Sequence, residues 1–173
     1  AVVQGARIAG AEQVIVSEPV EERRTHALAM GATTAVDPTS TDLREVVMDL
    51  TGGAGADYAF EAAGSGRLVQ TGIELTGVGG TVVMVGAPPI EDAVTIDAAV
   101  IFMTMGKRIL SSLLGGCWPA RDIPRLIGYW REGQLDLGGL VSRRLQLAEV
   151  NEGIRLLRET DGVRTVVDVA PAP

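Results

Sequence analysis

The chain has 173 residues, 46% hydrophobic and 21% charged, a balance typical of a folded protein rather than a disordered one. Its formal net charge of −7 argues against nucleic-acid binding, because that function needs a positive face to neutralise phosphates. One cysteine and one histidine cannot assemble a disulfide framework or a zinc site alone, and no apolar run approaches the roughly 18 residues of a membrane span.

Predicted helices and strands alternate along the chain, and its length fits a single domain. Apolar periodicity, capping residues and glycine stops indicate the helices, and short β-branched runs indicate the strands. In chain order we expect a helix at 1–10, a strand at 13–17, a helix at 20–30, a strand at 33–37, a helix at 40–53, a strand at 56–64, a helix at 66–77, a strand at 79–89, two short strands around an apolar segment at 93–116, helices at 120–135 and 147–162, and a strand at 163–169. This order predicts an α/β fold with a mostly parallel sheet and helices on both faces.

Glu18 follows the apolar run Val14-Ile15-Val16 and precedes a charged helical pattern. Ligands of open parallel sheets bind beyond the carboxyl ends of the strands, so an acid at a strand tip is a candidate binding residue. A carboxylate there can accept both hydroxyls of an adenosine ribose and repel a 2′-phosphate, which favours NAD over NADP. Arg23 and Arg24 could offset that repulsion. The alternative is that Glu18 only caps the helix start, where acids are favoured in any case.

A phosphate-binding glycine loop, Gly-x-Gly-x-x-Gly between a strand and a helix, is not found in the sequence. The glycines at 77–80 precede a strand and predict a tight turn, and those at 52–55 and 64–66 have the wrong spacing. The ribose acid normally follows the loop by about 20 residues, so the loop that belongs to Glu18 would fall at or before residue 1. We therefore expect the first strand and the glycine loop to be missing from this chain.

Three further side chains have chemistry that a site could use, and each also has a simpler interpretation. Glu61, in the segment FEAAG, could be a general base, yet an acid at a strand end is more often hydrogen-bonded locally. Cys117 could be a nucleophile, but the sequence supplies no partner base, because His26 falls in an outer helix and reads as a surface residue. Arg164, beside the last predicted strand, is either an anion contact or a solvated charge.

The order of several motifs strongly resembles the medium-chain zinc-dependent alcohol dehydrogenases over nearly the whole chain. The segments that carry the resemblance are VVQGARIAGAEQVIVSEPVEERRTHALAMGAT, GGAGADYAFEAAG, GGTVVMVGAPP and VNEGIRLLRETDGVRTVV. The family implies that residues 1–173 form one truncated, Rossmann-type, doubly wound NAD-binding domain and that the catalytic zinc domain is absent. It further implies hydride transfer between an alcohol–aldehyde pair and NAD, with zinc held only in the missing domain.

The resemblance also implies cofactor-binding roles for individual residues. The positions that match contacts to the adenosine ribose and the pyrophosphate are Glu18, Arg23 and Arg164. The positions that match the lining of the cofactor groove and the nicotinamide contacts are Ala62, Ala63, Gly64, Val85, Ala87, Ser112 and Leu114. The apolar segment 95–105 resembles the edge at which family members pair, which implies a homodimer or tetramer. No catalytic or metal-binding residue is expected in this chain.

Three alternative functions stay open at this point. A zinc-free quinone reductase shares the cofactor domain, and a methyltransferase with a related sheet also uses a strand-tip acid to hold the ribose of S-adenosylmethionine. A truncated, non-catalytic dimerisation module would need only the 95–105 edge. The expected partners are a small alcohol or aldehyde and further copies of the chain, with neither nucleic acid nor membrane, and a single cysteine fits a reducing, cytoplasmic setting.

Overall fold

The computed structural model describes residues 1–159 and 162–169. Its internal contacts divide the chain into two compact units. The first unit combines Ala1–Thr41 with Ala120–Pro173, and the second unit is Asp42–Pro119. The described strands form three parallel sheets of two, three and two strands, where the sequence predicted one mostly parallel sheet.

The N-terminal part of the first unit follows the predicted order of helix and strand. Its elements are α1 (Val2–Ile8), β1 (Ile15–Ser17), α2 (Glu21–Ala29) and β2 (Thr34–Val36). β1 and β2 pair in parallel, with Ile15 opposite Thr34 and Ser17 opposite Val36. Parallel neighbours need a crossover, which α2 supplies, and its Ala27 is buried, as are Val14 and Val36.

The C-terminal part of the first unit contains a strand that the sequence did not indicate. Its elements are α6 (Pro119–Arg131), β6 (Arg143–Gln146), the 3-10 turn η2 (Leu147–Glu149), α7 (Val150–Arg158) and β7 (Thr165–Asp168). β6 carries two arginines and lacks a β-branched run, so its pairing with β7 defines it rather than local propensity. The helix predicted at 147–162 ends earlier, at Arg158, and residues 160–161 lie outside the described part.

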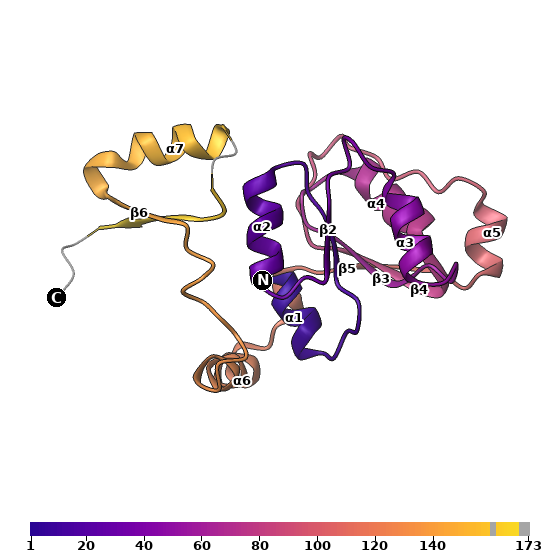
Figure 1. Cartoon of the computed structure of the whole chain (residues 1–173), viewed down its shortest axis with the longest axis horizontal. Coiled ribbons are helices and arrows are strands. Elements are labelled where there is room, and N and C mark those ends of the chain that lie inside the picture. The colour runs from indigo at the N-terminus through magenta and orange to yellow at the C-terminus, as the bar shows by residue number, and fades with distance from the viewer. Residues whose placement is uncertain (160–161, 170–173) are drawn as a thin grey trace. The chain divides into compact units, whose positions relative to one another are not determined.

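The second unit holds a three-stranded parallel sheet in the order β3-β4-β5. Its elements are α3 (Leu43–Leu50), β3 (Ala56–Glu61), α4 (Gly66–Leu75), β4 (Thr76–Met84), α5 (Ala99–Thr104), β5 (Arg108–Ser111) and the 3-10 turn η1 (Leu114–Gly116). Glu61 pairs with Met84, and Met84 pairs with Ser111, so the carboxyl ends of the three strands are in register. α4 packs on β3 and β4, and α3 packs on α4 (Figure 1).

The core of the second unit is aliphatic and is built by α4 against the sheet. Val69 of α4 and Val82 of β4 are 0% and 1% exposed, and Ile73 packs with them. Gly72 allows the close approach, because a Cβ there would lie 3.2 Å from Ala59 Cβ and from Val82 Cγ1. Burial of such side chains, at about 25 cal/mol per Å² of apolar surface, is the main force that holds the helix on the sheet.

Two predictions about the second unit are wrong. The glycines at 77–80 do not form a tight turn before a strand; they belong to β4, where the register against β3 shifts and Gly79 has a φ of 71°. The segment 93–116 contains one strand, β5, because residues 92–96 have no regular structure and 99–104 form α5. Val94 and Ile96 favour a strand locally, but no neighbouring strand in the described residues pairs with them.

Candidate functional site

The carboxyl ends of β1 and β2 place Glu18 beside the neighbouring strand. Its amide donates to the carbonyl of Val36 at 3.0 Å, which extends the parallel pairing by one residue. The side chain is half-buried, and its Oε1 accepts a hydrogen bond from the amide of Val20 at 2.9 Å. Among the described residues, Oε2 has no hydrogen-bond partner. One oxygen therefore binds the backbone at the start of α2, and the other has no protein partner in the described chain.

Arg24 is fixed across the same two strand ends. Its Nη1 donates to the carbonyls of Glu18 and Pro19, at 2.8 and 2.7 Å, and lies 3.3 Å from Oδ2 of Asp37. The hydroxyl and the amide of Thr39 donate to Asp37 Oδ1 at 2.6 and 2.9 Å. These two bonds, followed by the charge of Arg24, lower the pKa of Asp37. The guanidinium of Arg24 thus already binds two carbonyls and a carboxylate, although the sequence left open that it could bind a 2′-phosphate.

The turn before β7 is tied both to α2 and to the start of β6. Arg23 Nε donates to the carbonyl of Gly162 at 3.0 Å. Ser142 Oγ accepts from the amides of Val163 and Arg164 and donates to the carbonyl of Arg164, each at 3.0 Å. Arg23 therefore contacts a residue two positions from Arg164, whose side chain is exposed. Ser142 was not predicted, since a serine between two loops carries no signal of its own.

In the second unit, the turns that follow the three strands meet at one edge of the sheet. The carbonyl of Glu61 accepts from the amides of Val85 and Gly86 at 2.8 and 2.9 Å, and the amide of Ser112 donates to the carbonyl of Met84 at 2.9 Å. These turns lie side by side because the three strands end at the same level of the sheet. The predicted residues that this edge brings together are Ala62, Ala63, Gly64, Val85, Ala87 and Ser112.

Leu114 differs from the other predicted residues of the second unit. It lies in η1 with a φ of 49°, the left-handed region that residues other than glycine rarely adopt. Its side chain is 86% exposed. The predicted contact concerns the backbone at this position, and it stays a prediction.

Cys117 and His26 do not form a reactive pair or a metal centre. Cys117 is exposed, and no group of three or more His, Cys, Asp and Glu side chains in the described part of the chain is arranged to hold a metal ion. The prediction that His26 is a surface residue is wrong, because it is half-buried and its Nε2 is buried without a hydrogen-bond partner among residues 1–159 and 162–169. Within the same residues, no helix is long and apolar enough to span a bilayer.

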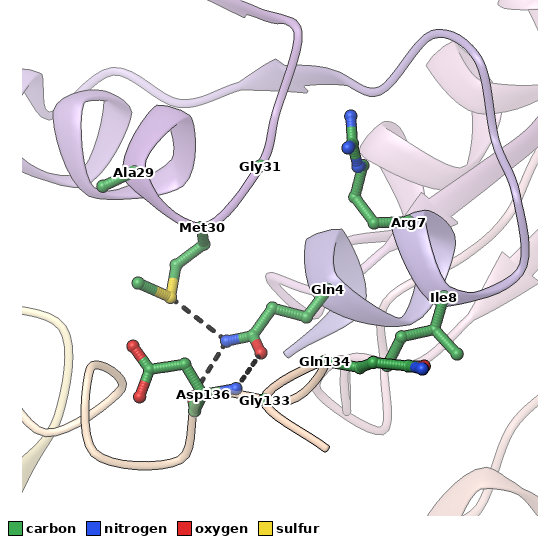
Figure 2. A pocket seen from close by; sticks show the side chains of 9 residues that line it. All are labelled: Gln4, Arg7, Ile8, Ala29, Met30, Gly31, Gly133, Gln134 and Asp136. Atoms are coloured by element: carbon green, nitrogen blue, oxygen red, sulfur yellow. Dashed lines mark hydrogen bonds between the residues drawn. The ribbon is translucent and has the colours of Figure 1, made fainter. Parts of the chain in front are cut away.

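A hollow of about 450 Å³ lies in the first unit, and none of the predicted cofactor residues lines it (Figure 2). Its lining consists of Gln4, Arg7, Ile8, Ala29, Met30, Gly31, Gly133, Gln134 and Asp136. Gln4 points from α1 toward Met30 and Asp136; its Nε2 donates to Met30 Sδ at 3.1 Å and to the Asp136 carbonyl at 3.0 Å. Its Oε1 accepts from the Asp136 amide at 2.7 Å. These bonds join α1 to the segment after α6, which is a structural role.

Parallel strands with polar turns at their carboxyl ends are the arrangement with which α/β proteins bind nucleotides. A family model described as zinc-binding dehydrogenase matches residues 1–129. The chain therefore belongs to the zinc-binding dehydrogenase family. This finding confirms the predicted family and the Rossmann-type α/β class, and it removes the methyltransferase alternative.

Several relatives with known names or structures are described as alcohol or zinc-binding dehydrogenases. An NDMA-dependent alcohol dehydrogenase of Amycolatopsis methanolica is 36% identical over 168 residues, which are 95% of this chain and 45% of that protein. The benzyl alcohol dehydrogenase of Acinetobacter calcoaceticus matches with a TM-score of 0.90 at 25% identity, over 97% of this chain and 46% of that one. A Sinorhizobium meliloti structure described as a zinc-binding dehydrogenase bound to NADP matches at 28% identity with a TM-score of 0.82, over 96% of this chain and 48% of that one. The chain thus spans about half the length of the proteins that it matches.

Proposed function

We propose that the chain is the cofactor-binding part of an NAD-dependent alcohol dehydrogenase, which passes a hydride between an alcohol–aldehyde pair and NAD. The observation that carries this proposal is the carboxylate of Glu18, which lies after β1 with one oxygen capping α2 and the other without a partner in the described chain. The alcohol dehydrogenases among the relatives support the class of reaction.

The charged side chains at the predicted site of the first unit suit the adenosine end of a dinucleotide. Glu18 Oε2 would accept hydrogen bonds from the ribose diol, Arg23 would flank that ribose, and the guanidinium group of Arg164 would bind the negative pyrophosphate. Hydrogen bonds to charged groups contribute about 1.5–3 kcal/mol each. NAD, when bound, supplies the hydride acceptor, and the residues of this chain bind and orient it.

The second unit would line the nicotinamide end of the cofactor. The turns 62–64 and 85–87 are held against each other by backbone hydrogen bonds from Val85 and Gly86 to Glu61. Ser112 and Leu114 follow β5 and would bind the carboxamide through their backbone. No side chain of these turns is proposed to react, so their task is to fix the plane and position of the ring.

Glu18 also favours NAD over NADP. A carboxylate about 4 Å from a 2′-phosphate costs about 4 kcal/mol per pair of unit charges at an effective dielectric near 20. Arg24 offsets little of this cost, because Asp37 and two carbonyls already hold its guanidinium. A solved structure similar to this chain is bound to NADP, so the titration that tests the proposal includes NADPH.

Zinc does not fit the described residues, because they contain no suitable cluster of ligands and the one cysteine is exposed. We therefore assign any zinc and most of the substrate pocket to the rest of the intact protein. No step of the reaction is assigned to a metal held by this chain.

Calorimetric titration of the intact protein with NADH, NADPH and S-adenosylmethionine tests the cofactor assignment. We expect saturable NADH binding, NADPH binding weaker by more than about tenfold, and no binding of S-adenosylmethionine. The 173-residue chain alone is expected to oxidise no alcohol, since it carries no proposed catalytic residue. Absence of NADH binding to the intact protein, or turnover by the chain alone, would contradict the proposal.

We also infer that segment 95–105 forms a subunit interface of a homodimer or tetramer. Its helix α5 exposes Val100, Ile101 and Met103 by 62%, 53% and 69%. Because the segment is coil and helix rather than strand, the subunits would meet by packing this apolar face rather than by pairing strands.

Light scattering tests this interface. It should give a dimer or larger for the intact protein and a monomer for Ile101→Glu, whereas Arg67→Glu, an exposed change on α4, should leave the mass unchanged. An unaltered mass for Ile101→Glu would exclude this interface.

A further inference from the structure

The carboxylate of Glu61 is buried inside the turn that follows β3. The residue is 6% exposed, and its Oε1 accepts hydrogen bonds from the amides of Ala63, Gly64 and Ser65 at 2.8, 2.7 and 3.3 Å. Three successive amides directed at one oxygen wrap the backbone of this turn around the side chain. A hydrogen-bonded carboxylate is a strong acceptor, so the path of residues 62–65 depends on Glu61.

The same residue also holds the turn that follows β4. Its carbonyl accepts from the amides of Val85 and Gly86. The two turns are in backbone contact, because a Cβ on Gly86 would lie 2.2 Å from the Gly64 nitrogen, and a Cβ on Gly64 would lie 2.7 Å from the Ala87 oxygen. Glu61 therefore joins both turns, through its side chain to one and through its main chain to the other.

Oε2 of Glu61 is buried and has no hydrogen-bond partner in the described part of the chain. An unpaired buried carboxylate oxygen is costly, so ending β3 is not a sufficient reason for a glutamate at this position. Nor can the group act as a general base, since Oε1 is fully used and Oε2 is enclosed. What the carboxylate does supply is a fixed geometry for two turns that the proposed function places beside the nicotinamide.

We propose that Glu61 is a positioning residue for the nicotinamide end of the cofactor. It acts through the turns 62–65 and 85–87 and touches no reacting atom. This inference rests on the proposed function, because it assumes that these turns bind NAD. Loosening them should weaken binding of the nicotinamide and leave binding of the adenosine and the pyrophosphate unchanged.

The test compares Glu61→Gln with Asp57→Asn in the intact protein, using NADH and ADP-ribose as ligands. Asp57 is an exposed acid on the same strand, so its change removes an equal charge without touching either turn. We expect Glu61→Gln to raise the dissociation constant for NADH at least about fivefold and to leave that for ADP-ribose within about twofold, while Asp57→Asn alters neither. Equal changes for the two ligands, or none, would overturn the inference.

Hydrogen exchange on the unaltered protein decides the question even where Glu61→Gln does not fold. The amides of Ala63, Gly64 and Ser65 should exchange slowly, and NADH should slow them further while ADP-ribose does not. Exchange at the rate of a free peptide, or no additional effect of NADH, would refute the positioning role. If the unaltered protein binds no NADH, the proposed function fails, and the exchange without ligand still shows whether the carboxylate holds its turn.

Discussion

Replacing Glu18 with alanine should raise the dissociation constant of NADH by about 10- to 100-fold in the intact protein. The reason is that the carboxylate would make charge-assisted hydrogen bonds to the ribose, and each contributes about 1.5–3 kcal/mol. Part of the loss has a second source, because Oε1 also caps the amide of Val20. Fluorescence titration with NADH, alongside a thermal melt, separates the ligand effect from the cap.

Glu18→Gln sharpens this test, because an amide oxygen still accepts from Val20 while the charge is removed. This variant should lose much of the preference for NADH over NADPH and melt close to the unaltered protein, since the repulsion of a 2′-phosphate needs a negative group. Glu21→Gln, an exposed acid in the first turn of α2, provides the matched control and should leave both affinities unchanged. If Glu18→Gln binds NADH and NADPH as before, the acid does not face the ribose.

The residues around Glu18 illustrate how far the sequence could predict this site. The run Val14-Ile15-Val16 and the charged helix after it were enough to place an acid at a strand tip, because both signals are local. The sequence could not predict that only one carboxylate oxygen of Glu18 would be hydrogen-bonded, because this depends on where the amide of Val20 lies. The role of Arg24 was equally hidden, because its partner Asp37 follows a different strand.

The features that the sequence missed all depend on partners far away in the chain. β6 exists because β7 pairs with it, and Ser142 matters because the turn before β7 returns to it. Gln4 was indistinguishable from any polar residue of an amphipathic helix, yet it bonds the main chain of Asp136 in both directions. For residues 93–96 the error is the reverse, because the sequence predicted a strand that the structure lacks. Their composition favours a strand, but no neighbouring strand in the described chain pairs with them.

Gly86→Ala should lower the free energy of unfolding by about 1–3 kcal/mol, the usual cost of forcing an extra methyl group into a packed site. The added Cβ would lie 2.2 Å from the Gly64 nitrogen and 2.8 Å from Glu61 Oε2, so the backbone of one turn must move away from the other. The cause is purely steric, because the φ of Gly86 does not fall in the left-handed region. Urea denaturation of the protein measures the change.

Gly128→Ala is the matched control, because it adds the same methyl group inside α6, where no atom beyond the local backbone of the helix lies within 4 Å of the new Cβ. It should stabilise the protein by about 0.5–1 kcal/mol, since alanine loses less backbone freedom than glycine in a helix. The two substitutions thus have opposite expected signs for one chemical change. A stabilising or neutral Gly86→Ala would mean that the turns after β3 and β4 do not touch as described, and the positioning role of Glu61 would lose its structural basis.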